Sequence, residues 1–304
     1  MTRPDPAWLD AQYNNRARIA DHAQVFERWA KASALARDQS TCGIEVAYGD
    51  GPAQTLDVFP SPRANAPVLV FIHGGYWRSL DKRDHSFVAP ALTAAGAMVV
   101  VPNYALCPAV GIEAIALQMV QALAWTHRHA AHYGGNPGHI VVAGHSAGGH
   151  LAAMLLSCRW SDVAPDLPAR LVRAALSISG LFELEPLRRT PFLQADLRLT
   201  RASAERLSPA HFPPPRGEMF AVVAADESEE FLRQNALIRS RWGERAVPVC
   251  ETLPGVNHLT ILHQLADPAA RLHGLALRLL GLAGDAADDG RSRRHAAPSL
   301  TCLP

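Results

Sequence analysis

The sequence predicts an α/β protein built on a mostly parallel, doubly wound sheet with leading antiparallel strands. Short, continuously apolar runs alternate with helical segments, and strands apolar on both faces are expected in a parallel sheet covered by helices on each side. Before these runs, residues 43–60 alternate between apolar and polar around Asp50-Gly51, a strong hairpin turn signal. The first two strands are therefore expected to be antiparallel.

The individual elements follow from these patterns in chain order. Apolar residues at helical spacing predict a helix over 21–36, within an N-terminal helical arm that spans 1–45. The expected parallel strands lie at 68–72, 98–101, 140–143, 174–179, 220–224 and 247–251. The expected helices lie at 85–95, 112–133, 147–158, 229–242 and 268–282. We expect one α/β domain over 46–282.

Two segments depart from this alternation. Residues 180–215 are rich in Pro and Arg and end in Pro213-Pro214-Pro215, which predicts a small cap or lid inserted over the strand ends. After Leu282 the chain is rich in Gly, Asp, Arg and Ser, so 283–304 is expected to be a disordered tail. Whether the cap or the N-terminal arm closes over a site stays open at this point.

The composition favours a cytoplasmic protein that acts on a small molecule. The 304 residues are 48% apolar and carry a formal net charge of +1, without the concentrated basic face that nucleic acid requires. No apolar run reaches the ~18 residues of a membrane span. The five cysteines show no paired spacing, so neither a disulfide framework nor a metal site is predicted, and no cofactor is expected. A homodimer is left open.

The strongest chemical signal is the segment Gly144-His145-Ser146-Ala147-Gly148-Gly149. It directly follows a predicted strand and precedes a predicted helix. A G-x-S-x-G turn in that position is typical of a nucleophile elbow, in which glycines let strand and helix approach each other while the serine is exposed at the sheet edge. Ser146 is therefore the candidate nucleophile.

A second signal follows the strand at 68–72, in the segment His73-Gly74-Gly75-Tyr76-Trp77. Acyl transfer produces an oxyanion that preorganised backbone N–H groups must stabilise, and adjacent glycines let the backbone approach closely. Gly74 and Gly75 are the candidate donors, with the Ala147 amide at the start of the elbow helix as a third. His73 is interpreted as a structural support of this loop.

A serine nucleophile needs a base, and the base needs an orienting carboxylate. The chain order expected for this fold is Ser, Asp, His. Asp226 follows the strand at 220–224, and His258 follows the last predicted strand, so we predict these two as orienting acid and base, with His263 as the reserve base. The rivals to Asp226 are its neighbours Glu227, Glu229 and Glu230.

Aromatic residues near these motifs are candidates for an apolar substrate pocket. They are Tyr76, Trp77, Tyr104 and Phe192.

Taken together, these motifs resemble the kynurenine formamidase (arylformamidase) branch of the α/β-hydrolases, which is related to the hormone-sensitive-lipase-like esterases. The likeness runs from about Tyr13-Asn14-Asn15-Arg16 to Leu282, and the Tyr-Trp after His-Gly-Gly is its most discriminating part. Further segments that carry it are Asn103-Tyr104-Ala105-Leu106-Cys107-Pro108, Asp226-Glu227-Ser228 and Val256-Asn257-His258.

The resemblance implies the α/β-hydrolase fold, a triad of Ser146, Asp226 and His258, and metal-independent hydrolysis of N-formylkynurenine. A broad carboxylesterase acting on short-chain aryl esters satisfies the same pattern. A third hypothesis is a non-catalytic ligand-binding member of the fold.

Overall fold

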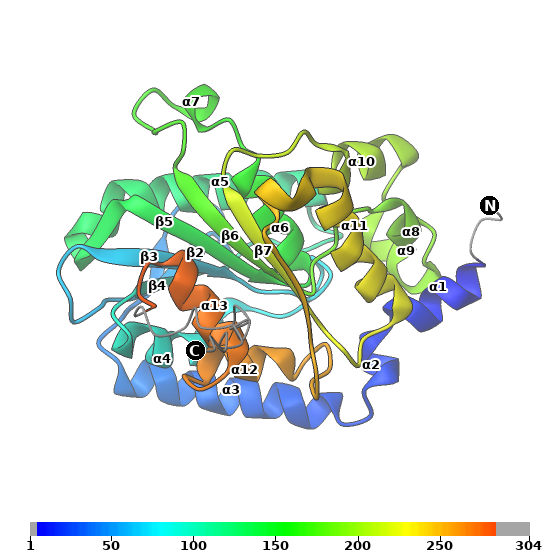
Figure 1. The fold of residues 1–304 in the computed structure, drawn as a ribbon, viewed down its shortest axis with the longest axis horizontal. Helices are drawn as coiled ribbons and strands as arrows, with labels where there is room; N and C mark the ends of the chain where they lie inside the picture. The colour runs from blue at the N-terminus through cyan, green and yellow to red at the C-terminus, as the bar shows by residue number, and fades with distance from the viewer. Residues whose placement is uncertain (1–4, 284–304) are drawn as a thin grey trace, which may run out of the picture.

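The computed structural model describes residues 5–283, which form an eight-stranded sheet between two helical layers (Figure 1). The strand order is β1-β2-β4-β3-β5-β6-β7-β8, antiparallel from β1 to β4 and parallel from there on. This arrangement confirms the predicted fold class. The strands are β1 Gly43–Ala47, β2 Thr55–Phe59, β3 Ala66–Ile72, β4 Met98–Pro102, β5 Gly135–His145, β6 Val172–Ile178, β7 Glu218–Ala224 and β8 Val249–Leu253.

The helices also follow the predicted order. The N-terminal arm contains α1 Pro6–Tyr13, α2 Asn15–Arg18 and α3 His22–Gln39, and the cap contains α8 Glu185–Arg188, α9 Pro191–Leu197 and α10 Arg201–Arg206. The remaining α-helices are α4 Ala89–Ala94, α5 Ile112–His129, α6 Ala147–Leu156, α7 Trp160–Val163, α11 Glu229–Ala246, α12 Ile261–Ala266 and α13 Arg271–Leu279. The short helices α7 and α12 lie outside the predicted helical ranges, and the expected tail, apart from its first residue, lies outside the described residues.

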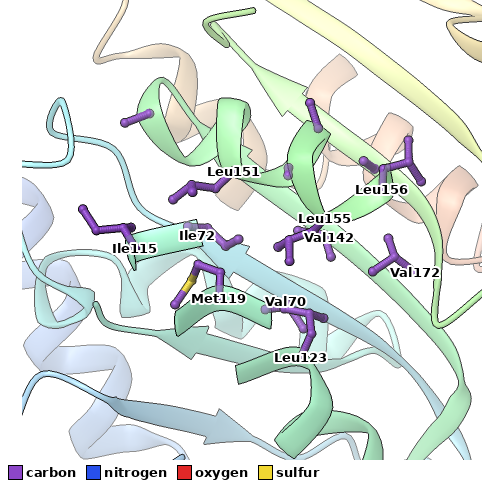
Figure 2. Packing of buried hydrophobic residues seen from close by; sticks show 14 of the residues in the cluster. Val70, Ile72, Ile115, Met119, Leu123, Val142, Leu151, Leu155, Leu156 and Val172 are labelled. Carbon is purple, nitrogen blue, oxygen red and sulfur yellow. The ribbon is translucent and has the colours of Figure 1, made fainter. Parts of the chain in front are cut away.

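Alternate residues of the central strands face two separate cores, as strand geometry requires. One core joins the sheet to α5, α6 and α11, and the other joins it to α3, α4, α12 and α13 (Figure 1). In the first core, the β3 and β5 side chains meet residues of α5 and α6. Figure 2 labels Val70, Ile72 and Val142 from the strands, with Ile115, Met119, Leu123, Leu151 and Leu155 from these helices.

Within residues 5–283, no helix combines the length and apolarity needed to cross a membrane.

The N-terminal arm packs against the rest of the domain. The Tyr13 hydroxyl donates a 2.6 Å hydrogen bond to Glu230 on α11, and the Tyr76 hydroxyl donates to the Tyr13 carbonyl at 2.6 Å. The Phe192 amide, in the cap, donates to the Asp10 carboxylate at 3.2 Å. The arm is thereby joined to both the strand-end loops and the cap.

Six of the described histidines are buried, and burial lowers the pKa of four of them: His73, His85, His145 and His150. Burial lowers the pKa of His85 to about 3 and that of His150 to about 4. Burial also lowers the pKa of His73 and of His145. At pH 5.5 and above, the imidazoles of His85 and His150 are therefore held neutral in the folded protein.

Stability is expected to fall when the pH is lowered from 7.5 to 5.5. Below about pH 6.5 the unfolded chain protonates His85 and His150 while the folded chain leaves them neutral, so each costs about 1.4 kcal/mol at pH 5.5. The loss should reach at least about 3 kcal/mol in urea unfolding followed by circular dichroism. His150→Gln should make this pH dependence shallower, and the exposed control His132→Gln should not. Equal stability at both pH values would contradict the prediction.

Candidate active site

The candidate residues meet because they follow the carboxyl ends of parallel strands, which lie at one edge of the sheet. Gly74 follows β3, and Ser146 follows β5, which pairs with β3 in parallel. His258 follows β8, and the segment after β7 supplies an acid. The topology thus brings four distant segments together at this edge.

Ser146 occupies a tight turn between β5 and α6, as predicted. Its backbone has φ +56° and ψ −116°, a sparsely populated conformation for a residue other than glycine. Its N–H donates to the Ile178 carbonyl at 2.8 Å, which fixes the turn to β6. A Cβ at Gly144 would lie 2.1 Å from the Gly148 carbonyl oxygen, so the crossing of strand and helix requires glycine there.

The acid that contacts His258 is Glu227, and the prediction of Asp226 was wrong. Nδ1 of His258 donates to Oε2 of Glu227 at 2.6 Å, and both side chains are buried. The other oxygen of Glu227 accepts from the Ala224 amide at 3.0 Å and from the Ser179 hydroxyl. Three donors therefore hold this carboxylate in place.

The turn after β7 explains the difference. The Ala225 amide donates to Leu253 at 2.8 Å and the Asp226 amide to Val256 at 3.3 Å, so the chain follows the β8 side for two residues beyond the strand. A turn then closes from the Glu227 amide to the Ala224 carbonyl at 3.4 Å. This path leaves the Asp226 side chain exposed and directs Glu227 inward.

His258 has one ring nitrogen available for chemistry. Because the Glu227 carboxylate accepts a hydrogen bond from Nδ1, Nε2 of the neutral imidazole carries the free lone pair. The loop is held by His145, whose Nε2 donates to the His258 carbonyl at 2.7 Å. His258 and Ser146 line the same cavity. His263, the reserve base, instead accepts a hydrogen bond from Trp29 at 3.1 Å.

The loop after β3 lies directly against the serine. A Cβ at Gly74 would lie 3.1 Å from Cβ of Ser146 and 2.9 Å from the His145 carbonyl oxygen, so only glycine permits this approach. His73 supports the loop, as its interpretation predicted, because its Nδ1 donates to the Gly74 carbonyl at 2.9 Å. Tyr104 stacks on His73 with ring centroids 4.2 Å apart and donates to the His73 carbonyl at 2.9 Å.

This arrangement fixes the carbonyl groups of the loop and brings its glycines beside the elbow. Ala147 is the first residue of α6, and the amides of a first helical turn have no partner within the helix. Gly74 therefore lies against Ser146, Gly75 lines the cavity that contains the serine, and Ala147 begins the helix that follows it.

Two of the four predicted pocket residues line the cavity. Tyr76 and Phe192 do so, with ring centroids 6.0 Å apart. Trp77 and Tyr104 do not: Trp77 is fully buried against His150, and Tyr104 is occupied with His73 beneath the loop. Aromatic residues following a motif can face the core as readily as the cavity, so their sequence position alone did not separate the two.

The N-terminal arm supplies cavity residues that sequence reasoning missed. They are Asn14, Asn15, Arg16, Phe26 and Trp29. The arm and the cap therefore both contribute walls to the cavity, since Phe192 belongs to α9.

Across residues 5–283, no cluster of three or more His, Cys, Asp or Glu side chains is placed to hold a metal ion.

The chain is similar in sequence to known hydrolases. The BD-FAE family model matches residues 56–161, which contain both the glycine loop and the elbow. Kynurenine formamidase of Salmo salar is 29% identical over 252 residues, covering 78% of this chain and 82% of that protein. Esterase LipC of Mycobacterium tuberculosis is 34% identical over 154 residues, covering 48% of this chain and 38% of that protein.

Solved structures give the same architecture. A candidate thioesterase from Silicibacter sp. is 29% identical, with a TM-score of 0.78, and the match covers 90% of this chain and 98% of that one. Esterase B of Lactobacillus rhamnosis has a TM-score of 0.64 at 17% identity, a likeness in fold alone; the match covers 87% of this chain and 97% of that one.

Fold, strand-end loops and similarities together make the protein an α/β-hydrolase. Within that superfamily it is a homologue of the kynurenine formamidases and is also related to esterases.

Proposed function

We propose that the protein is a serine hydrolase that cleaves a small aryl formamide or ester through an acyl-enzyme. The observation that carries this proposal is the 2.6 Å contact of His258 with Glu227, in a cavity that His258 shares with Ser146. A buried carboxylate that orients an imidazole beside a strained serine is the arrangement that activates a hydroxyl nucleophile.

In the first half of the proposed reaction, Nε2 of His258 takes the proton of the Ser146 hydroxyl as Oγ attacks the substrate carbonyl. The amides of Gly74, Gly75 and Ala147 stabilise the oxyanion. Glu227 stabilises the imidazolium that forms. Collapse of the intermediate breaks the bond to the leaving group, which leaves with the proton returned by His258.

In the second half, water replaces the leaving group. His258 removes a proton from this water, which attacks the acyl carbon of the Ser146 ester. The tetrahedral intermediate again places its oxyanion at the same amides, and its collapse releases the acid and restores the Ser146 hydroxyl. The chain's own residues supply every proton transfer in this sequence.

The cavity walls support an aryl substrate. Phe26, Trp29, Tyr76 and Phe192 give it an aromatic lining close to the serine. A formyl group needs almost no acyl pocket, whereas an aryl leaving group gains from aromatic walls. The similarity to kynurenine formamidases favours N-formylkynurenine as the substrate, and the similarity to esterases favours a short-chain carboxylesterase as the second candidate.

Side-by-side kinetics on N-formylkynurenine and p-nitrophenyl acetate separate these functions. We expect kcat/KM for N-formylkynurenine to exceed that for the ester by at least about tenfold, because differential binding of a matched leaving group is worth that much. Turnover of the ester alone would identify a carboxylesterase instead. Turnover of neither substrate would favour a ligand-binding protein without activity.

A further inference from the structure

The cavity that contains Ser146 is positively charged at the side formed by the N-terminal arm. Two of the described residues that line it, Arg16 and Arg78, are cationic, and none of them is an aspartate or glutamate. A cavity with unbalanced positive charge attracts anionic ligands and raises their local concentration.

The two arginines differ in how their charge is balanced. Arg78 forms an ion pair with Asp196 and donates to the Phe192 carbonyl at 3.3 Å. Arg16 lies over the Phe26 ring at 5.4 Å and donates to the Ser79 hydroxyl at 3.3 Å, which is a neutral acceptor. Within residues 5–283 it forms no ion pair with a carboxylate. Its guanidinium therefore retains unmatched charge and spare donors.

The electrostatic environment of Arg16 agrees with this difference. Arg16 is exposed to solvent, and its partial burial lowers the pKa of its guanidinium, which the positive charge of Arg78 lowers further. Two cations held near each other favour an anion between or beside them.

Asn15 provides an independent observation at the same place. It is 7% exposed and lines both this cavity and the adjoining hollow beside Asp21, yet its amide Nδ2 has no hydrogen-bond partner among the described residues. Buried polar groups without partners are costly, and such a group at a binding site is satisfied when the ligand arrives. The amide lies next in sequence to Arg16 and offers N–H donors.

We infer that Arg16 and Asn15 bind a carboxylate on the substrate, so that the enzyme prefers anionic aryl substrates over neutral ones. This inference rests on the proposed hydrolase function. The planar guanidinium fork suits the two oxygens of a carboxylate, and the Asn15 amide adds a donor. The aromatic residues of the cavity lining hold the aryl group, with the scissile carbonyl at Ser146.

A matched substrate pair tests the inference. Phenyl acetate and 4-acetoxybenzoate carry the same acyl group, and their leaving groups differ by one carboxylate. The readout is the ratio of kcat/KM for the anionic ester to that for the neutral ester. Arg16→Gln is expected to lower this ratio by about 10- to 100-fold, the loss typical of a charged hydrogen bond. Arg16→Lys should retain part of it, since the charge remains.

Arg18→Gln is the control, because Arg18 lies on the same helix and does not line this cavity; it lines an adjoining hollow, beside Asp21, that shares Asn15 and His258 with the cavity. It removes the same charge and should leave the ratio within about twofold. An unchanged ratio in Arg16→Gln, or equal loss on both esters, would overturn the inference and leave Arg16 as part of the wall.

Binding measurements separate failure of this inference from failure of the proposed function. Calorimetry in the Ser146→Ala background requires no turnover, and Arg16→Gln added to it should weaken binding of 4-acetoxybenzoate by about tenfold or more. If the wild-type protein hydrolyses neither of these esters nor N-formylkynurenine, the proposed function fails, while the binding measurement still decides the carboxylate site. Equal affinity with and without Arg16 would overturn the site.

Discussion

Replacing Ser146 with alanine is expected to lower kcat/KM by about 10⁴-fold or more on whichever substrate the wild-type enzyme prefers. The substitution removes the atom that forms the acyl-enzyme, so the remaining activity comes from binding and oxyanion stabilisation alone. Both residues carry a Cβ, so the strained turn at φ +56° is no harder for alanine to adopt than for serine. Initial-rate kinetics with a purified variant measure the loss.

The exposed Ser161 gives a matched control for this experiment. Ser161→Ala deletes the same hydroxyl from a short helix outside the cavity and should keep activity within about twofold. Thermal unfolding of both variants shows that neither has lost its fold. Activity of Ser146→Ala within tenfold of the wild type would remove Ser146 as the nucleophile.

The second large effect is expected at Glu227. Glu227→Gln keeps the size of the side chain but removes the charge that stabilises the His258 imidazolium, and it can present an N–H to Nδ1 in place of an acceptor. An equivalent change in a serine-hydrolase triad costs about 10⁴-fold, so we expect a loss of at least about 10³-fold in kcat. Steady-state kinetics at saturating substrate measure it.

Asp226 is the matched control, because it is the adjacent acid and its side chain is exposed. Asp226→Asn should change kcat by no more than about threefold, the size expected for a surface charge. The opposite result, a large loss in Asp226→Asn and a small one in Glu227→Gln, would show that the acid contacting His258 in this structure is not the one used in catalysis.

The sequence was sufficient for the fold and for the segments that meet at the site. The apolar strand runs and the Asp50-Gly51 turn predicted the sheet, because strand burial and hairpin formation depend on local sequence. The elbow at Ser146 and the glycines after β3 were recognisable for the same reason, since each needs a particular residue within a few positions of a strand end.

The choice between Asp226 and Glu227 could not be made from sequence. It depends on two backbone hydrogen bonds that carry the chain past the end of β7 along the β8 side, which sets which acid faces inward. Hydrogen bonds of this kind join segments about 30 residues apart, so a local sequence pattern does not indicate them. Only the presence of Glu227 among three neighbouring acids pointed to the alternative.

The residues that form the cavity walls could not be identified from the sequence either. Arg16 and Asn15 lie about 130 residues from Ser146 in sequence. They line the same cavity as Ser146 because Tyr13 is anchored to Glu230 and Tyr76. Trp77 and Tyr104 follow promising motifs but pack beneath the loop. Tertiary packing of side chains, which no periodicity encodes, decided both outcomes.

Covalent labelling with a fluorophosphonate tests the central claim most directly, because only a serine activated by a neighbouring base reacts rapidly with this reagent. Peptide mass spectrometry of the labelled protein should show one adduct, on Ser146, and its rate of formation should fall sharply in His258→Gln and Glu227→Gln. An unlabelled protein, an adduct on another serine, or labelling that is indifferent to both substitutions would contradict the account.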